Sequence, residues 1–160
     1  MTHGHFLSPV GLRNVVVLWR DPRDMRVSFY YHCFFVNERQ NAGLVRLMNE
    51  RCPFKDYTDI RANLPTFIRF VSQTAVTPSF SWPEFVSVWA HRPGTVQTSY
   101  QALSADTPAD VELSFVCEGA LGGWRRHFTA DAEAALREGA YAEAMRGLRY
   151  EFENHVAGTP

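Results

Sequence analysis

The segment Val15–Ser28 reads VVVLWRDPRDMRVS and joins an apolar run directly to a charged turn and a helical pattern. Its first part, Val15–Trp19, is short, continuous and rich in β-branched residues, which predicts a buried parallel strand. Asp21 is a suitable helix cap and Pro22 suits the first helical turn, so we predict a largely buried helix that runs to about Glu38. The segment therefore predicts a strand, a tight turn and a helix without a gap.

The turn in this segment is a candidate anion site. A strand that leads straight into a helix places free backbone N–H groups and the positive end of the helix dipole at one point, where phosphate commonly binds. The planar guanidinium of Arg20 can hold two phosphate oxygens, and the Ser28 hydroxyl can reach the same groove. The alternative is that Arg20, Asp21, Arg23 and Asp24 form a solvated charge cluster at a helix start. Composition alone leaves both interpretations open.

The complete motif resembles the 3'-phosphate-binding motif of the sulfotransferases that use 3'-phosphoadenosine 5'-phosphosulfate (PAPS). It consists of an apolar strand, then Arg-Asp-Pro-Arg-Asp, then Val-Ser, and finally the aromatic run Phe29–His32. The resemblance implies that Arg20 and Ser28 bind the 3'-phosphate of the PAPS co-substrate, and that Pro22 and Asp24 have structural roles. It also implies transfer of a sulfuryl group from PAPS to a hydroxyl or amine of a small-molecule or glycan acceptor.

The N-terminal stretch Thr2–Leu7 is similar to the segment of the family in which a histidine takes the proton of the acceptor hydroxyl. Either His3 or His5 matches that catalytic residue. We favour His5, because apolar residues follow it as they do in the family. A neutral imidazole suits this role near physiological pH. The alternative is that both are surface histidines near a chain end.

A second strand is predicted over Thr95–Tyr100, and its end resembles the family's strand that ends in Tyr-Glu-Asp-Leu. The resemblance implies that Tyr100 lies near the adenine of the cofactor, where an aromatic face and a hydroxyl are both useful. Gln101 and Ala102 replace the acidic pair of that motif. A buried core tyrosine is an equal alternative for Tyr100.

The stretch Phe115–Thr129 resembles the family's cofactor-covering loop, in which glycines allow the backbone to approach a phosphate closely. The resemblance implies this cofactor-binding role for Gly119. Cys117 and Glu118 stand where the family has arginine and lysine. A carboxylate beside a phosphate is repulsive, by about 1 kcal/mol or more depending on the local dielectric, unless the pair Arg125–Arg126 compensates.

Nothing in the chain resembles the family's lysine-containing loop, which holds the 5'-phosphosulfate, so the resemblance covers only the C-terminal part of a sulfotransferase. We therefore expect residues 1–160 to form a single, partial sulfotransferase domain. The alternative function is that of a catalytically inactive, truncated relative that at most binds adenosine 3',5'-bisphosphate. The two differ in whether sulfuryl transfer occurs.

The expected fold class is α/β: a truncated, P-loop NTPase-like three-layer fold with a short parallel sheet flanked by helices. Such a small sheet would have exposed edges and incompletely covered apolar faces, so we expect instability or self-association through these surfaces. Beyond the first helix, further helices are predicted over Asn41–Arg51, over Thr58–Ser72 with a bend or break at Pro65, from Ser81 onward, and over Ala130–Leu148.

Composition limits the partners, the metal sites and the cellular location that we expect. A net charge of −1, from 16 basic and 17 acidic residues, gives no reason to expect a nucleic-acid partner or a polybasic membrane contact. The three cysteines have no metal-ligand spacing, so we expect no metal site, and they favour a reducing, cytoplasmic location. No apolar run approaches the roughly 20 residues that span a bilayer.

Overall fold

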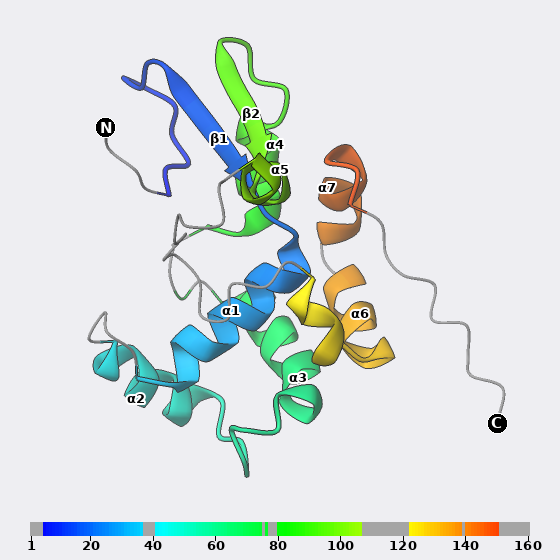
Figure 1. Ribbon diagram of the computed structural model, residues 1–160. Helices are drawn as coiled ribbons and strands as arrows, with labels where there is room; N and C mark the ends of the chain where they lie inside the picture. Colours follow the sequence, from blue (N-terminus) through cyan, green and yellow to red (C-terminus); the bar gives the residue numbers. More distant parts are fainter. Residues whose placement is uncertain are drawn as a thin grey trace, which may run out of the picture.

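The computed structural model describes residues 5–36, 41–74, 76, 80–106, 122–138 and 140–150. In this part of the chain the protein is a mostly helical α/β structure with one two-stranded parallel sheet and seven α-helices. The strands project from one end of the helical body (Figure 1). In chain order the elements are β1 (Val15–Trp19), α1 (Pro22–Phe34), α2 (Ala42–Arg51), α3 (Ile60–Gln73), α4 (Trp82–Trp89), β2 (Thr95–Ser99), α5 (Tyr100–Asp106), the 3₁₀ helix η1 (Gly123–Arg126), α6 (Ala130–Arg137) and α7 (Tyr141–Gly147).

The sheet confirms both predicted strands and their parallel pairing. The register runs from Val15 opposite Thr95 to Trp19 opposite Ser99. Parallel strands require a long crossover connection, and here helices α1 to α4 provide it. The carboxyl ends of β1 and β2 therefore meet at the same edge of the sheet, next to the start of α1.

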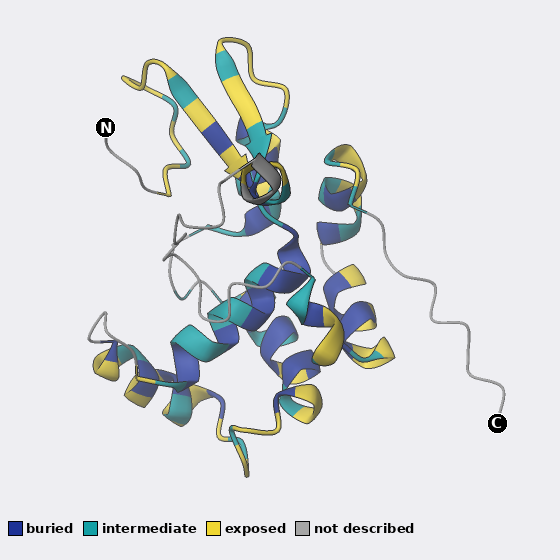
Figure 2. Cartoon of the chain, viewed as in Figure 1, coloured by how far each residue is buried: buried dark blue, intermediate teal, exposed yellow. Residues whose placement is uncertain are grey.

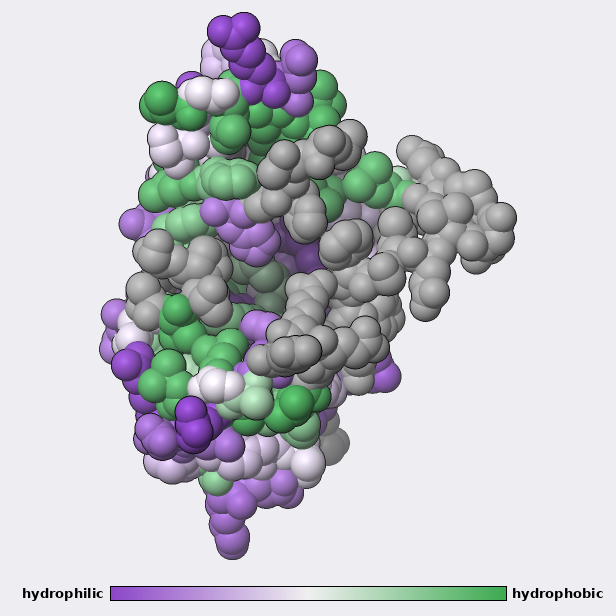
Figure 3. Space-filling view, turned by 90° about the vertical axis from the view of Figure 1, so that its left-hand side faces the viewer, coloured by the Kyte–Doolittle hydropathy of each residue, from purple (hydrophilic) through white to green (hydrophobic). Residues whose placement is uncertain are grey.

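Only one face of this sheet is covered. Val17 and Trp19 point into the core, whereas Val16, Leu18 and Val96 are 61%, 48% and 62% exposed. Apolar side chains gather at this end of the molecule in Figure 3, and exposed and buried positions alternate along β1 in Figure 2. The alternation follows from the two-residue period of a strand. The expectation of an incompletely covered apolar face is confirmed.

The first helix is shorter than predicted. It ends at Phe34 instead of near Glu38, because Phe35 has an extended backbone. The side-chain amide of Asn41 donates to the carbonyl oxygens of His32 (2.5 Å) and Phe35 (3.0 Å). These bonds satisfy carbonyl groups that the end of a helix leaves without partners.

Helix α3 is continuous through Pro65, so the predicted break at this residue does not occur. Pro65 lies inside the helix and is buried, as are its neighbours Leu64 and Phe67. A proline removes one backbone hydrogen bond from the ladder. Burial of the apolar side chains around it keeps the helix intact despite that loss.

Two other predictions about the helices also need correction. The strand predicted to end at Tyr100 ends at Ser99, and Tyr100 begins α5, where Ser99 caps by accepting from the backbone N–H of Ala102 (3.0 Å). The single helix predicted over Ala130–Leu148 is two helices, α6 and α7. The sequence contains Gly139 between them, and glycine inside a helix is about 1 kcal/mol less favourable than alanine.

Tyr30 lies at the centre of an aromatic core between α1 and α3. Its ring packs on Phe34 and Phe67, with centroid distances of 4.7 and 5.3 Å. Its hydroxyl donates to the carbonyl oxygen of Tyr57 (3.0 Å) and accepts from the Asn63 amide (2.9 Å). The buried hydroxyl is thus fully hydrogen-bonded.

The same burial predicts a loss of stability at alkaline pH. It raises the pKa of Tyr30 from 10.0 to about 12. Because the folded pKa is the higher one, the contribution of this group is fully present below about pH 10 and is lost as the pH rises towards about 12. Urea denaturation across this range should show a shallower decline in the free energy of unfolding for Tyr30→Phe than for the wild type. An equal decline in both proteins would contradict this assignment.

Neither a membrane span nor a metal cluster occurs in the described residues. None of the described helices is both long enough and apolar enough to cross a bilayer. No group of three or more histidine, cysteine, aspartate or glutamate side chains is arranged there to hold a metal ion.

Candidate functional site

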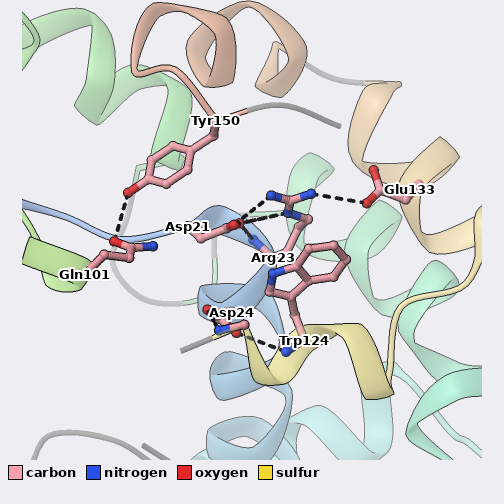
Figure 4. A network of polar contacts seen from close by, with 8 residues as sticks. Asp21, Arg23, Asp24, Gln101, Trp124, Glu133 and Tyr150 are labelled. Carbon is pink, nitrogen blue, oxygen red and sulfur yellow. Dashed lines mark hydrogen bonds and ion pairs between the residues drawn. The ribbon is translucent and has the colours of Figure 1, made fainter. Parts of the chain in front are cut away.

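The turn between β1 and α1 is organised by Asp21. As the helix cap, its carboxylate accepts from the backbone N–H of Arg23 (2.9 Å). It also pairs with the Arg23 guanidinium, with 2.7 Å between Nη2 and Oδ2 and 3.0 Å between Nε and Oδ1. Figure 4 shows this pair facing Trp124 and Glu133. The two charges of Asp21 and Arg23 neutralise each other inside the protein.

Arg23 also connects α1 to the C-terminal helices. Its guanidinium carbon lies 3.9 Å from the ring centroid of Trp124. Its Nη1 lies 3.7 Å from a carboxylate oxygen of Glu133 on α6. Asp21, Arg23 and Asp24 are all buried, so the alternative of a solvated charge cluster is wrong for these three residues.

Asp24 ties the segment around η1 to the first turn of α1. One oxygen of its carboxylate accepts from the backbone N–H of Gly122 and the other from that of Trp124, both at 3.0 Å. The two partners are 98 and 100 residues away in the chain. This gives Asp24 the structural role that the motif implied. It also fixes the C-terminal end of the stretch that resembles a cofactor-covering loop.

Gly122 has a backbone conformation that favours glycine. Its φ is +71°, in the left-handed region, and a Cβ atom there would lie 2.5 Å from a guanidinium nitrogen of Arg125. Side chains other than hydrogen are strained in this region. A glycine therefore lets the chain turn into η1 while its N–H points at Asp24.

Arg20 and Tyr100 lie next to each other at the carboxyl edge of the sheet. Trp19 and Ser99 are register partners, so the residues that follow them are brought together. The guanidinium carbon of Arg20 is 5.3 Å from the centroid of the Tyr100 ring. Tyr100 is 9% exposed, as the core alternative predicted, but its ring also faces the cation. The structure thus brings together two of the predicted cofactor-binding residues.

No carboxylate compensates the charge of Arg20 among the residues that the structure describes. Its side chain is half-buried, and its Nε is fully buried without a hydrogen-bond partner in the described structure. No ion pair joins Arg20 to an acidic residue in the described part of the chain. This contrasts with Arg23, only three positions later, which contacts two carboxylates. Within the described structure, the Arg20 guanidinium is therefore available to an anionic group.

Ser28 lies on the face of α1 that meets the η1 segment. It is four residues after Asp24 and three before Tyr31, and residues at these spacings share a helix face. Asp24 bonds to Gly122 and Trp124, and the Tyr31 ring packs edge-on against His127 (6.2 Å). Ser28 is half-buried, and its hydroxyl makes no hydrogen bond among the described residues. Its position is consistent with a ligand lying between α1 and that segment.

His5 is not brought to this site in the described structure. His5 is exposed, and no contact joins it to Arg20, Ser28 or Tyr100 in the part of the chain that the structure describes. The carbonyl of the next residue, Phe6, accepts from the Trp89 indole (2.7 Å) and so anchors this stretch to α4. His3 and Gly119 lie outside the described residues, as do Cys117 and Glu118.

Sequence reasoning missed several groups around the turn. Glu133 and Tyr150 come from the C-terminal part of the chain, and nothing in their spacing indicates contact with α1. The Tyr150 hydroxyl donates to the Gln101 side chain (3.4 Å), and burial raises its pKa to about 12. Arg26 could have been identified from the sequence, because Arg20, Arg23 and Arg26 recur at every third position.

The chain matches no protein-family model, no curated protein and no solved structure at a significant level. Interpretation of the site therefore rests on the sequence motif and on the geometry of the turn.

Proposed function

We propose that the protein binds the 3'-phosphate of adenosine 3',5'-bisphosphate and of PAPS at the carboxyl edge of the sheet, and that it is a sulfotransferase. Arg20 carries this proposal. Its guanidinium lies beside an aromatic ring, at a strand-to-helix turn, and has no carboxylate partner in the described residues. Arginine recognises phosphate through paired N–H donors, and a strand-to-helix turn adds backbone N–H groups. Ser28 contributes a hydroxyl from α1.

The finer fold assignment is part of the same proposal. A parallel strand pair with its candidate ligand at the carboxyl ends of both strands supports a P-loop NTPase-like layered fold. One face of the sheet is open, with Val16, Leu18 and Val96 exposed. This supports the proposal that the layered fold is incomplete in this chain. We propose that further layers of such a fold would cover this face.

The proposed reaction is an in-line displacement at sulfur. An acceptor oxygen or nitrogen attacks the sulfur of PAPS, the bond from sulfur to the 5'-phosphate oxygen breaks, and adenosine 3',5'-bisphosphate leaves. The proton of the acceptor passes to a base, for which we propose His5 or His3 as a neutral imidazole. Arg20, Ser28 and Tyr100 hold the nucleotide end and do not touch the reacting atoms.

One observation favours the second candidate function, a non-catalytic binder of adenosine 3',5'-bisphosphate. The only lysine in the sequence is Lys55. It is exposed in the connection between α2 and α3, and Figure 1 places that connection at the opposite end of the molecule from the sheet. No lysine is thus near the turn to stabilise the charge that develops on the leaving oxygen.

Calorimetric titration with adenosine 3',5'-bisphosphate tests the binding part of the proposal. We expect binding by the wild-type protein and a loss of about 10- to 100-fold in affinity for Arg20→Ala, because a hydrogen-bonded charge pair contributes about 1.5–3 kcal/mol. Ser28→Ala should lose less, about 3- to 10-fold, since it removes one neutral donor.

Arg13→Ala is the matched control. It removes the same charge from an exposed residue before the amino end of β1, so its affinity should equal that of the wild type. An equal loss in Arg13→Ala and Arg20→Ala would show a general charge effect and contradict a defined site. Incubation with sulfur-labelled PAPS and a panel of phenol and amine acceptors then separates the two functions. Binding without transfer identifies the non-catalytic one.

A further inference from the structure

Three arginines, one just before α1 and two in its first turns, each lie over an aromatic ring. They differ in how their charge is balanced. Arg20 faces Tyr100, Arg23 faces Trp124, and Arg26 faces Tyr141 at 4.9 Å from the ring centroid. Arg23 is neutralised by two carboxylates. Arg20 belongs to the proposed 3'-phosphate site. Arg26 has no role in the proposed 3'-phosphate site.

Arg26 is a buried cation without a counter-ion among the described residues. Only 6% of the residue is exposed, its Nε is buried without a hydrogen-bond partner, and it forms no ion pair within the described residues. Burial lowers its pKa to about 10, so the guanidinium is still protonated at neutral pH. The neighbouring Cys33 thiol does not supply the missing charge, since burial raises its pKa to about 12 and keeps it neutral.

Tyr141 brings a second unsatisfied donor to the same place. It is 2% exposed on α7, and its buried hydroxyl has no hydrogen-bond partner in the described structure. Trp82 on α4 lies parallel to the Tyr141 ring, with 5.7 Å between centroids and 4° between planes, and holds it in position. Two donors, one of them charged, thus occur on contacting side chains, and the described structure gives neither of them an acceptor.

Burial of an unpaired charge is strongly unfavourable, and a cation–π contact offsets only part of that penalty. Guanidinium N–H groups only donate hydrogen bonds, and a phenol can donate one. The group that completes this cluster must therefore be rich in acceptors and negatively charged. An oxyanion such as sulfate or phosphate meets both requirements.

We propose that Arg26 and Tyr141 form a second anion site, between α1 and α7, which takes a sulfate or phosphate group of a small ligand. This site is distinct from the one at Arg20 and does not depend on it. Arg26 and Tyr141 are 6% and 2% exposed, so a ligand reaches them only when the side chains that cover this site move.

Thermal denaturation of the Arg20→Ala protein in millimolar sulfate tests the proposal, with chloride at equal ionic strength as the reference. The Arg20→Ala background removes the first site, so failure of the proposed function and failure of this proposal give different results. We expect sulfate to raise the Tm of Arg20→Ala and to leave the Tm of Arg20→Ala/Arg26→Met unchanged. Replacing Tyr141 with phenylalanine in the same background should weaken sulfate binding several-fold.

Two results would overturn the second site. One is the absence of any sulfate-dependent shift in Arg20→Ala, and the other is a shift of the same size after Arg26→Met. Loss of the fold does not obscure the result, because Arg26→Met removes an unbalanced buried charge and should itself keep or raise the Tm without sulfate. The Tyr141→Phe protein retains Arg26 and provides an independent measurement of the same site.

Discussion

Replacing Arg23 with methionine should lower the free energy of unfolding by about 3–5 kcal/mol, because removal of one partner leaves buried charges unpaired. Arg23 is 5% exposed and pairs with Asp21 through two of its nitrogens. It also lies 3.7 Å from Glu133 and covers the Trp124 ring. Urea denaturation followed by circular dichroism measures the change.

Arg69→Met is the matched control for this prediction. Arg69 makes a similar paired contact with Glu138, at 2.8 and 2.9 Å, but both side chains are about half exposed. Exposed ion pairs contribute little to stability. We therefore expect near wild-type stability for Arg69→Met. Similar losses in the two variants would contradict the importance of burial at Arg23.

Replacing Asp24 with alanine should lower the free energy of unfolding by about 2–4 kcal/mol, since two backbone N–H groups lose their acceptor. The Asp24 carboxylate is the acceptor for both Gly122 and Trp124. Amide hydrogen exchange of these two residues should become faster, while exchange in α3 should change only as much as the global stability does. Unchanged protection of the Gly122 amide against hydrogen exchange would contradict its hydrogen bond to Asp24.

Asp24→Asn and Asp131→Ala provide the comparisons. The asparagine retains one acceptor oxygen, so we expect an intermediate loss of stability. Asp131 lies exposed in the first turn of α6, and its replacement should affect Gly122 little. If Asp24 also holds the segment that faces Ser28, Asp24→Ala should weaken binding of adenosine 3',5'-bisphosphate.

Local sequence patterns predicted the elements whose causes are local. The apolar run Val15–Trp19, the cap at Asp21 with Pro22, and the start of a helix at Ser81 all occur as predicted. The capping box of α4 forms between Ser81 and Glu84. Parallel pairing of the two strands also followed from strand–helix alternation. The apolar run and the helix caps depend on neighbours within a few residues, whereas the strand pairing joins Val15 to the distant Thr95.

The incorrect or missing predictions concern features that depend on residues distant in the sequence. Helix α1 ends at Phe34 partly because Asn41 binds its last carbonyl groups, and α5 begins at Tyr100 where the pattern indicated a strand. The tie between Asp24 and Gly122 joins residues almost 100 positions apart, which no local pattern indicates. At the candidate site, the motif predicted that Arg20 and Tyr100 would serve the same ligand, and the strand register places them together.

The most direct test of the central claim compares two ligands that differ in one group. Adenosine 3',5'-bisphosphate and adenosine 5'-monophosphate differ only in the 3'-phosphate, and calorimetry gives both affinities for the wild type and for Arg20→Ala. We predict that the wild type binds the bisphosphate at least about 10-fold more tightly, and that Arg20→Ala removes this preference. Equal affinities of the wild-type protein for the two ligands, or a preference that persists in Arg20→Ala, would contradict a 3'-phosphate site at the turn between β1 and α1.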